Sequence, residues 1–316
     1  MAKVRVASIG YGHLGRWHAQ KVLACKSAEL VAVVEKAPAA QTAAKEAGLP
    51  VIDDLAKVLD KIDAAIIATP TSTHFDVAMA LLQAGKHVFC EKPVTFTLAQ
   101  AATLQNAALK VPGLVFQVGH SERLHEVWEW VRGEHTPPAW PENFAFDTPS
   151  IWRFNRLAAF KGRATDVDVV ADLMIHDIDL MLWLLQEMPT EVAAWGYKIR
   201  TNKWDHVTAT FRFAHGNQVF ITAGRNWGQE VRSVDLVNEQ GSWQIDLFNQ
   251  KVVAAGKSND AASFTQTFSY AKRDHLLIEQ EKFYQAIQQQ QRPLVSLEEG
   301  KNAVAVAEMV LQALDQ

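Results

Sequence analysis

The sequence KVRVASIGYGHLG, residues 3–15, is the strongest indication of how the amino-terminal part of this chain folds. An apolar, β-branched run from Val4 to Ile9 predicts a strand that leads directly into a glycine-rich turn, and a helical segment follows. Gly10 allows a tight turn, Gly12 lets the backbone approach a pyrophosphate, and Gly15 lets the helix pack closely on the strand. The spacing is typical of dinucleotide binding, and the alternative is a glycine-rich turn in another kind of α/β protein.

A second apolar run, Leu30 to Val34, ends on Glu35, 20 residues after Gly15. At that position a carboxylate can accept hydrogen bonds from a ribose 2′-hydroxyl, while the helix N-terminus faces the phosphates. The charge of Glu35 repels a 2′-phosphate and favours NAD, whereas Lys36 offers a partial countercharge that leaves NADP as the alternative. The other residues expected to line this cofactor site lie between the glycines: Tyr11, His13 and Leu14.

The composition and charge of the chain argue against several classes of protein. The chain has 316 residues, enough for two domains, and its net charge of −4 gives no basic field for nucleic acid. The two cysteines, Cys25 and Cys90, form no C-x-x-C, so we expect neither a disulfide framework nor a metal site. No secretory signal and no apolar stretch long enough for a bilayer are seen, and we expect a cytoplasmic protein without a membrane partner.

Residues 1–120 alternate short apolar runs with helical patterns, which predicts parallel strands joined by crossover helices. The expected strands are Val4–Ile9, Leu30–Val34, Ala64–Ala68, His87–Cys90 and Val115–Val118, and the expected helices include Phe75–Ala84 and Thr97–Ala108. Ligands of such sheets bind at the carboxyl ends of the strands. That rule selects the residues that follow the strands, Thr69-Pro70 and Glu91-Lys92-Pro93.

The second part of the chain has strand signals from Glu191 to Tyr270. The run Val207–Phe213 alternates apolar and polar residues, and short turns at 215–217 and 239–241 predict hairpins, hence an open antiparallel sheet. One face of that sheet needs a cover, so we expect a homo-dimer or homo-tetramer. The predicted domains are 1–120 and an α+β domain, 121–295, with a capped helix at 296–316 that packs back on the first domain.

Two further motifs can carry chemistry. Lys92 follows a predicted strand and precedes Pro93, which stiffens the chain; it can donate to a substrate oxygen, or it is an ordinary lysine in a turn. Asp172 and His176 are four residues apart, so one helix face presents both, and a carboxylate beside an imidazole suits an acid–base histidine. The alternative is that Asp172 is only an N-cap and that Asp177 and Asp179 are favourable first-turn charges.

The motifs together resemble the Gfo/Idh/MocA oxidoreductase family. They are GYGHLG (10–15), ATPTSTH (68–74), AGKHVFCEKP (84–93), VGH (118–120), DLMIHDIDL (172–180) and RPLVSLEEG (292–300). The resemblance implies a Rossmann domain followed by an α+β domain, an NAD(P)-dependent reaction at a CH–OH group, and Lys92, Asp172 and His176 as catalytic residues. It adds Thr69, Pro70, His74, Glu91 and Lys92 to the expected cofactor contacts. Residues 168–171 are Asp-Val-Val-Ala where many members carry three glycines, which leaves the substrate open.

Candidate substrate contacts precede the Asp172 segment. They are His120, Arg153, Arg156, Lys161 and Arg163, and the last four could meet a diphosphate or form a solvated loop or subunit contact balanced by nearby aspartates. The form DLMIHDID is similar to that of members acting on UDP-amino sugars, including UDP-N-acetylglucosamine 3-dehydrogenases. A free sugar or inositol dehydrogenase is the alternative within the same chemistry, and a non-catalytic NAD-sensing regulator is the alternative from another class.

Overall fold

The computed structural model describes residues 2–135, 148–162, 165–257 and 263–315. The chain forms two compact units, Met1–Ser121 with Asp274–Val304, and Glu122–Arg273 with Ala305–Gln316. This division differs from the predicted domains in two places. Helix α7 (His275–Gln289) belongs to the first unit, and the last turns of α8 (Leu297–Leu314) group with the second.

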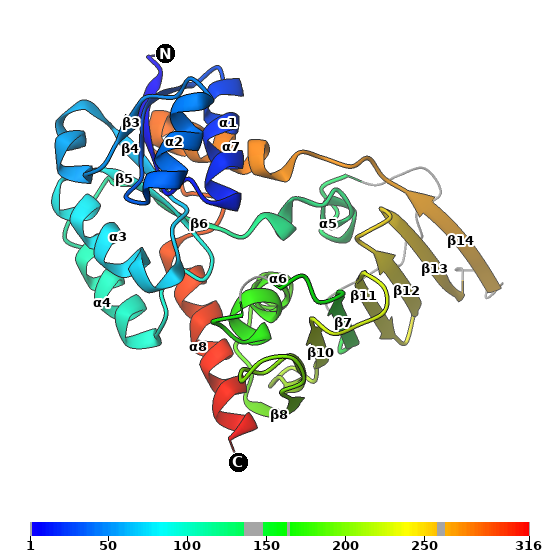
Figure 1. Ribbon diagram of the computed structural model, residues 1–316. Helices are drawn as coiled ribbons and strands as arrows, with labels where there is room; N and C mark the ends of the chain where they lie inside the picture. The colour runs from blue at the N-terminus through cyan, green and yellow to red at the C-terminus, as the bar shows by residue number, and fades with distance from the viewer. Residues whose placement is uncertain (1, 136–147, 163–164, 258–262, 316) are drawn as a thin grey trace. The chain divides into compact units, whose positions relative to one another are not determined.

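The first unit is built on a six-stranded parallel sheet with the strand order β3-β2-β1-β4-β5-β6 (Figure 1). Its strands are β1 (Val4–Ile9), β2 (Ala28–Val34), β3 (Val51–Ile52), β4 (Ala64–Ile67), β5 (His87–Glu91) and β6 (Phe116–Gly119). This order confirms the predicted Rossmann fold. The strand order reverses between β1 and β4, and ligands of such sheets bind at the strand ends beside that reversal.

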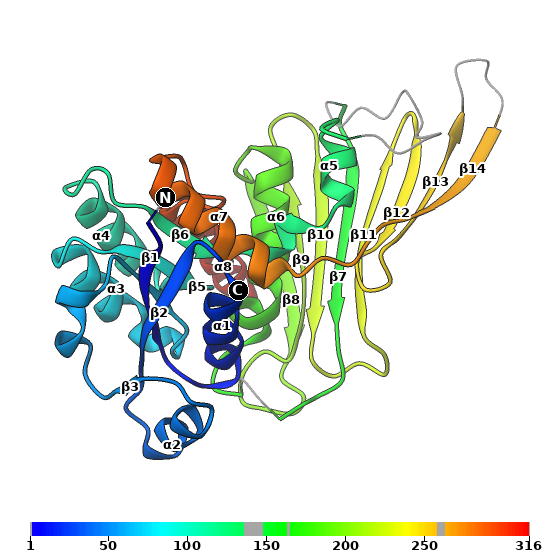
Figure 2. The same cartoon turned by 90° about the horizontal axis from the view of Figure 1, so that it is seen from above.

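Helices cover both faces of this sheet. They are α1 (His13–Ala24), α2 (Pro38–Glu46), α3 (His74–Gln83), α4 (Leu98–Ala108), α7 and the first turns of α8. Figures 1 and 2 show α3 and α4 on one face and α1 and α7 on the other. Because successive residues of a strand point to opposite faces, Ala7 packs in the core beneath α3 and α4 while Val6 packs with α1 and α7.

The second unit contains an eight-stranded sheet with the order β14-β13-β12-β11-β7-β10-β9-β8. Its strands are β7 (Ile151–Leu157), β8 (Glu191–Tyr197), β9 (His206–Arg212), β10 (Gln218–Gly224), β11 (Val231–Asn238), β12 (Gly241–Asp246), β13 (Lys251–Lys257) and β14 (Ser263–Ser269). The two predicted hairpins, β9–β10 and β11–β12, are confirmed. All neighbouring pairs are antiparallel except β7 and β10, which pair in parallel.

Apart from the last turns of α8, the helical segments of the second unit precede β7 or lie between β7 and β8. The first two are the short η4 (Ser121–Leu124) and α5 (Val127–Val131). The π-helical segment η5 (Val170–Met174) runs directly into α6 (Ile175–Leu185), and η5 contacts β10. Within the described residues, no helix combines the length and hydropathy that crossing a membrane requires.

Candidate functional site

The three glycines of the first turn differ in what surrounds them, as the sequence predicts. Gly10 has φ +92°, and a Cβ there would lie 2.6 Å from the carbonyl oxygen of Ala68, so the turns after β1 and β4 meet at this point. A Cβ on Gly15 would lie 2.2 Å from the carbonyl oxygen of Gly10. A Cβ on Gly12 would meet nothing within 4 Å. The structure thus leaves space only where a pyrophosphate needs to approach the backbone, and the turn fits a dinucleotide.

Glu35 directly follows β2, and its carboxylate is turned toward this same turn. Oε2 accepts from the backbone N–H of Tyr11 at 2.7 Å, and Oε1 accepts from the N–H groups of Lys36 and Ala37 at 2.8 and 2.9 Å. The carboxylate is therefore held in one orientation beside the glycine turn, where a ribose can reach it.

The other residues of the turn are placed differently from one another. The Tyr11 ring is buried among Ala19, Val33 and Ala44, and its backbone N–H donates to Glu35. His13, Leu14 and Lys36 are exposed. Their side chains stay predicted cofactor contacts.

His74, the first residue of α3, connects the turns that follow β4 and β5. Its Nδ1 lies 2.9 Å from the carbonyl oxygen of Pro93 and its Nε2 lies 2.9 Å from the carbonyl oxygen of Thr69. The ring is 1% exposed, and burial lowers the pKa of His74 although both nitrogens face carbonyl oxygens. The buried ring cannot line an open cofactor site, but it holds Thr69 and Pro93 at a fixed spacing. Pro70, beside Thr69, is exposed.

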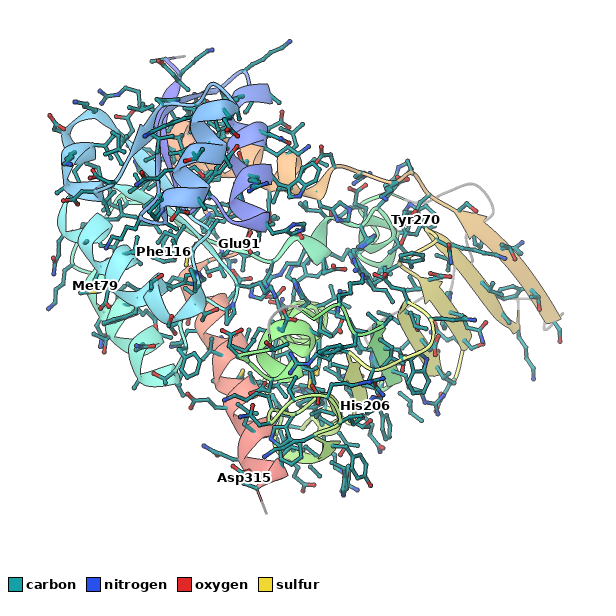
Figure 3. All side chains as sticks on the ribbon, viewed as in Figure 1. Met79, Glu91, Phe116, His206, Tyr270 and Asp315 are labelled. Carbon is teal, nitrogen blue, oxygen red and sulfur yellow. The ribbon has the colours of Figure 1, made fainter. Side chains whose placement is uncertain are left out.

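Glu91 ends β5 and is labelled in Figure 3, at the point where the Lys92 turn begins. Its Oε1 lies 2.7 Å from Nε2 of His18, and its Oε2 accepts from the backbone N–H of Lys92 at 3.2 Å. Lys92 itself is half-buried. His18 was not predicted from the sequence. A signal did exist, because a polar ring three residues after Gly15 lies on the helix face that packs on the sheet and needs a buried partner.

His120 follows β6 and is 1% exposed, with its backbone N–H donating to the carbonyl of Val118 at 3.0 Å. It lies in the first unit, as Lys92 does. Its role as a substrate contact stays a prediction.

In the second unit, Asp172 lies in the π-helical segment η5 and His176 in the first turn of α6. Both are half-buried. The wider π turn keeps residues four apart on nearly the same face, and single π turns are frequent at functional sites. Asp172 is not the N-cap, because it lies inside η5, whose N-cap position is Val169. Just ahead of the segment, Oδ1 of Asp168 accepts from the N–H of Ala171 at 3.0 Å.

A buried ionic cluster lies close to His176. Arg156 on β7 donates from Nε and Nη2 to Asp177 at 2.9 and 2.8 Å, and from Nη1 to Glu122 at 3.2 Å. Burial alone would raise the pKa of Glu122, but Arg156 and the neighbouring histidines and arginine hold it well below its usual range. Glu122 is thus a fixed negative charge whose field reaches His176.

Asp179 makes a second buried pair in α6. Its Oδ2 and Oδ1 accept from Nε and Nη2 of Arg123 at 2.8 and 2.6 Å. Asp177 and Asp179, interpreted from the sequence as first-turn charges, therefore anchor α6 through two bidentate arginine pairs.

The basic residues ahead of η5 do not form one group. Arg156 is 5% exposed and faces the same side of β7 as Trp152 and Phe154, whereas Arg153 is exposed on the opposite side. Arg153 and Arg156 cannot contact the same diphosphate, because a strand sends residues three apart to opposite faces.

Lys161 is exposed, with Nζ 3.4 Å from Oε2 of Glu230. Arg163 lies outside the described residues. Among the residues described, no group of three or more His, Cys, Asp or Glu side chains is placed to hold a metal ion.

Comparison with known proteins agrees with this geometry. Residues 4–120 match the model of an oxidoreductase family with an NAD-binding Rossmann fold, GFO_IDH_MocA, and residues 135–244 match the Gfo/Idh/MocA C-terminal domain. The predicted NAD-binding Rossmann domain and the class of enzyme, an oxidoreductase, are confirmed.

Individual relatives are similar along most or all of their length. The chain is 33% identical to UDP-N-acetylglucosamine 3-dehydrogenase of Acidithiobacillus ferrooxidans, covering 100% of this chain and 98% of that one. A solved structure of that enzyme is similar with a TM-score of 0.89 and 32% identity, covering 100% and 99%. The scyllo-inositol 2-dehydrogenase (NAD(+)) of Bacillus subtilis is 27% identical, covering 93% of this chain and 89% of that one.

Proposed function

We propose a reaction for this chain, which belongs to the Gfo/Idh/MocA oxidoreductase family. The chain oxidises the 3-hydroxyl of a UDP-linked N-acetylamino sugar with NAD. The similarity to UDP-N-acetylglucosamine 3-dehydrogenase carries the proposal, since it extends over the entire chain at 33% identity. The inositol dehydrogenases among the relatives support the alternative substrate, a free polyol, at lower identity.

Three residues receive roles in this reaction. When bound, NAD accepts a hydride from the carbon that bears the hydroxyl. We assign the proton of that hydroxyl to Nε2 or Nδ1 of His176, or to Lys92 as the neutral amine, since either group can accept it. Asp172 supports the positive charge that develops on His176, and Lys92 as an ammonium would stabilise negative charge on the same oxygen.

The fixed charge of Glu122 supports the assignment to His176. A negative group inside the second unit favours the imidazolium form, so proton transfer to this histidine costs less than it would beside apolar neighbours. Arg156 partly offsets that field, because it pairs with both Glu122 and Asp177.

The choice of NAD over NADP rests on Glu35. Its carboxylate is held by three backbone N–H groups beside the glycine turn, so it cannot easily turn away from a 2′-phosphate. Titration with each reduced cofactor, followed by protein fluorescence, should give tighter binding of NADH. Tighter binding of NADPH would contradict the assignment and make Lys36 the residue to examine next.

The substrate is tested by a panel. The protein with NAD is mixed with UDP-N-acetylglucosamine, UDP-N-acetylgalactosamine, UDP-glucose, myo-inositol or scyllo-inositol, and absorbance of the reduced nicotinamide is followed. Reduction with the UDP-N-acetyl sugars alone supports the proposal, and reduction with inositols alone selects the alternative. NAD binding without turnover on any member of the panel favours the regulator.

We also propose that the protein is a cytoplasmic homo-dimer or homo-tetramer. On β9 the side chains of Thr208 and Thr210, which point to the outward face of the second sheet, are half-buried, whereas Val207 and Ala209 on the opposite face are buried. The outward face is thus less covered than the inward one, which supports an assembly. The two cysteines are both free thiols, as a reducing compartment would keep them. Light scattering after size-exclusion chromatography measures the assembly, and a monomer at micromolar concentration would contradict it.

A further inference from the structure

A continuous chain of hydrogen bonds runs through the interior of the first unit, from α7 to the end of β5. The Tyr284 hydroxyl donates to Oε1 of Gln280 at 3.1 Å, and Nε2 of Gln280 lies 2.9 Å from Nδ1 of His18. Nε2 of His18 then meets Oε1 of Glu91 at 2.7 Å, and Oε2 of Glu91 accepts from the N–H of Lys92. Tyr284, Gln280 and His18 are all 0% exposed, so water does not compete for these bonds.

The network fixes the direction of each bond. The Gln280 amide nitrogen also lies 3.3 Å from the backbone carbonyl of His18, while its oxygen faces the Tyr284 hydroxyl. The amide nitrogen therefore donates, and Nδ1 of His18 accepts. The proton of the His18 ring then resides on Nε2, which donates to Glu91. The histidine acts as a rigid connector between α7 and the carboxylate.

We propose that His18 is a positioning residue for Lys92, which it holds through the carboxylate of Glu91. The inference rests on the proposed function, in that Lys92 acts on the substrate hydroxyl. A carboxylate held at one oxygen by His18 presents its other oxygen in a fixed direction to the first N–H of the turn. Gly119 leaves the space for this arrangement, because a Cβ there would lie 3.0 Å from Oε1 of Glu91.

The charges around Glu91 agree with this role. Burial alone would raise the pKa of Glu91, but the His18 hydrogen bond and Lys92 outweigh it and lower the pKa. The other titratable groups that interact with Glu91, among the described residues, are Cys90 from β5, His74 from α3 and Glu279 from α7. Burial and the charge of Glu91 raise the pKa of Glu279 well above its usual value. The negative charge of the pair thus resides on Glu91, beside Lys92, for as long as His18 donates to it.

Three substitutions of His18 separate positioning from space filling. His18→Gln places an amide near the position of Nε2 and keeps a donor for Glu91, whereas His18→Asn places it near Nδ1 and leaves Glu91 without one. His18→Phe keeps the ring shape alone. We expect His18→Gln to retain kcat within about threefold, and His18→Asn and His18→Phe to lose about 10- to 100-fold, as small misplacements of reacting groups do. The dissociation constant of NADH should change less than about twofold in all three.

The pH dependence of kcat/KM distinguishes a positioning role from a purely structural one, which would leave that dependence unchanged. Without the donor, the pKa of Glu91 rises, so the acid limb of kcat/KM shifts to higher pH in His18→Asn and stays in place in His18→Gln. Gly119→Ala crowds the Glu91 carboxylate directly and leaves His18 unchanged. Gly119→Ala should show the same loss of kcat, so it tests the inference even where a His18 variant does not fold.

Two results would overturn the inference. One is a wild-type kcat and acid limb in His18→Asn, and the other is an equal loss in His18→Asn and His18→Gln. Lys92→Ala measured in parallel separates this inference from the proposed function. If Lys92→Ala keeps full turnover, the assigned role of Lys92 is wrong. If Lys92→Ala is inactive while His18→Asn is normal, only the positioning role is wrong.

Discussion

Gly15 approaches the backbone of Gly10 so closely that a Cβ on Gly15 would lie 2.2 Å from the Gly10 carbonyl oxygen. Gly12, between them in sequence, has nothing within 4 Å of the corresponding position. Two glycines of one motif are thus required for different reasons. Gly15 serves the packing of α1 on the turn, and Gly12 serves the approach of the ligand.

Substituting the two glycines should separate stability from binding. Gly15→Ala must displace backbone, so we expect it to lower the free energy of unfolding by about 1–3 kcal/mol and to weaken NADH binding as well. Gly12→Ala should leave unfolding within about 0.5 kcal/mol and weaken NADH binding alone. Urea unfolding and fluorescence titration measure the two quantities. Gly228→Ala, also in open space, is the control for both, and a Gly12→Ala variant that binds NADH normally would contradict the prediction.

Removal of a catalytic group should reduce turnover and spare the cofactor. We expect Lys92→Ala or His176→Ala to lower kcat by about 10²–10⁴-fold, because each takes away a group that acts on the hydroxyl oxygen or its proton. The dissociation constant of NADH should change less than about twofold. The control is His215→Ala, whose side chain is 84% exposed. Full turnover in either catalytic variant would refute that residue's role.

The two arginines of β7 should respond very differently to truncation. Arg156→Ala removes the bidentate partner of the buried Asp177 carboxylate and leaves Glu122 with Arg232 and His125 alone, and breaking a buried pair costs about 3–5 kcal/mol. Arg153→Ala, on the exposed side of the same strand, should change the free energy of unfolding by less than about 0.5 kcal/mol. Chemical denaturation of both variants tests this. Equal free energies of unfolding for the two variants would show that the Arg156 ion pairs make no net contribution to stability.

Glu279 should make the stability of the protein depend on pH. Burial, and then the charge of Glu91, raise the pKa of this carboxyl above the value of 4.5 that it has when unperturbed. Between those two pKa values the unfolded chain has released the proton that the folded chain retains, so the free energy of unfolding falls as pH rises. Glu279→Gln removes this term.

The variant should therefore gain stability relative to the wild type as pH rises from about 4.5 to 8, in urea unfolding at each pH. Glu281→Gln, exposed on the same helix, is the matched control. A difference between wild type and Glu279→Gln that stays constant with pH would mean that Glu279 titrates normally.

Local patterns predicted much of the fold. The first glycine turn, the alternating strands and both hairpins depend on residues close in sequence, and each is found in the structure. The capping box of α8 is also confirmed, with Ser296 and Glu299 bonded reciprocally. The two-residue strand β3 escaped prediction, because two residues show no periodicity.

Pairings between distant residues could not be predicted in the same way. Arg123 and Asp179 are 56 residues apart, and His18 and Glu91 are 73 apart, so neither pair leaves a local pattern. The separation of Arg153 from Arg156 required knowing that this segment is a strand, which the sequence had not indicated. The π-helical turn at Asp172 was hidden for another reason, since its residues suit an α-helix equally well.

His74 lies between the carbonyl oxygens of Thr69 and Pro93 and thereby sets the distance between the loops that follow β4 and β5. An imidazole is planar and stiff, so the separation of its two nitrogens works as a spacer that neither loop can change alone. A shift imposed on the loop after β4 must then be passed to the loop that starts with Lys92. We therefore expect ligand contact at one loop to displace the other loop through the His74 ring.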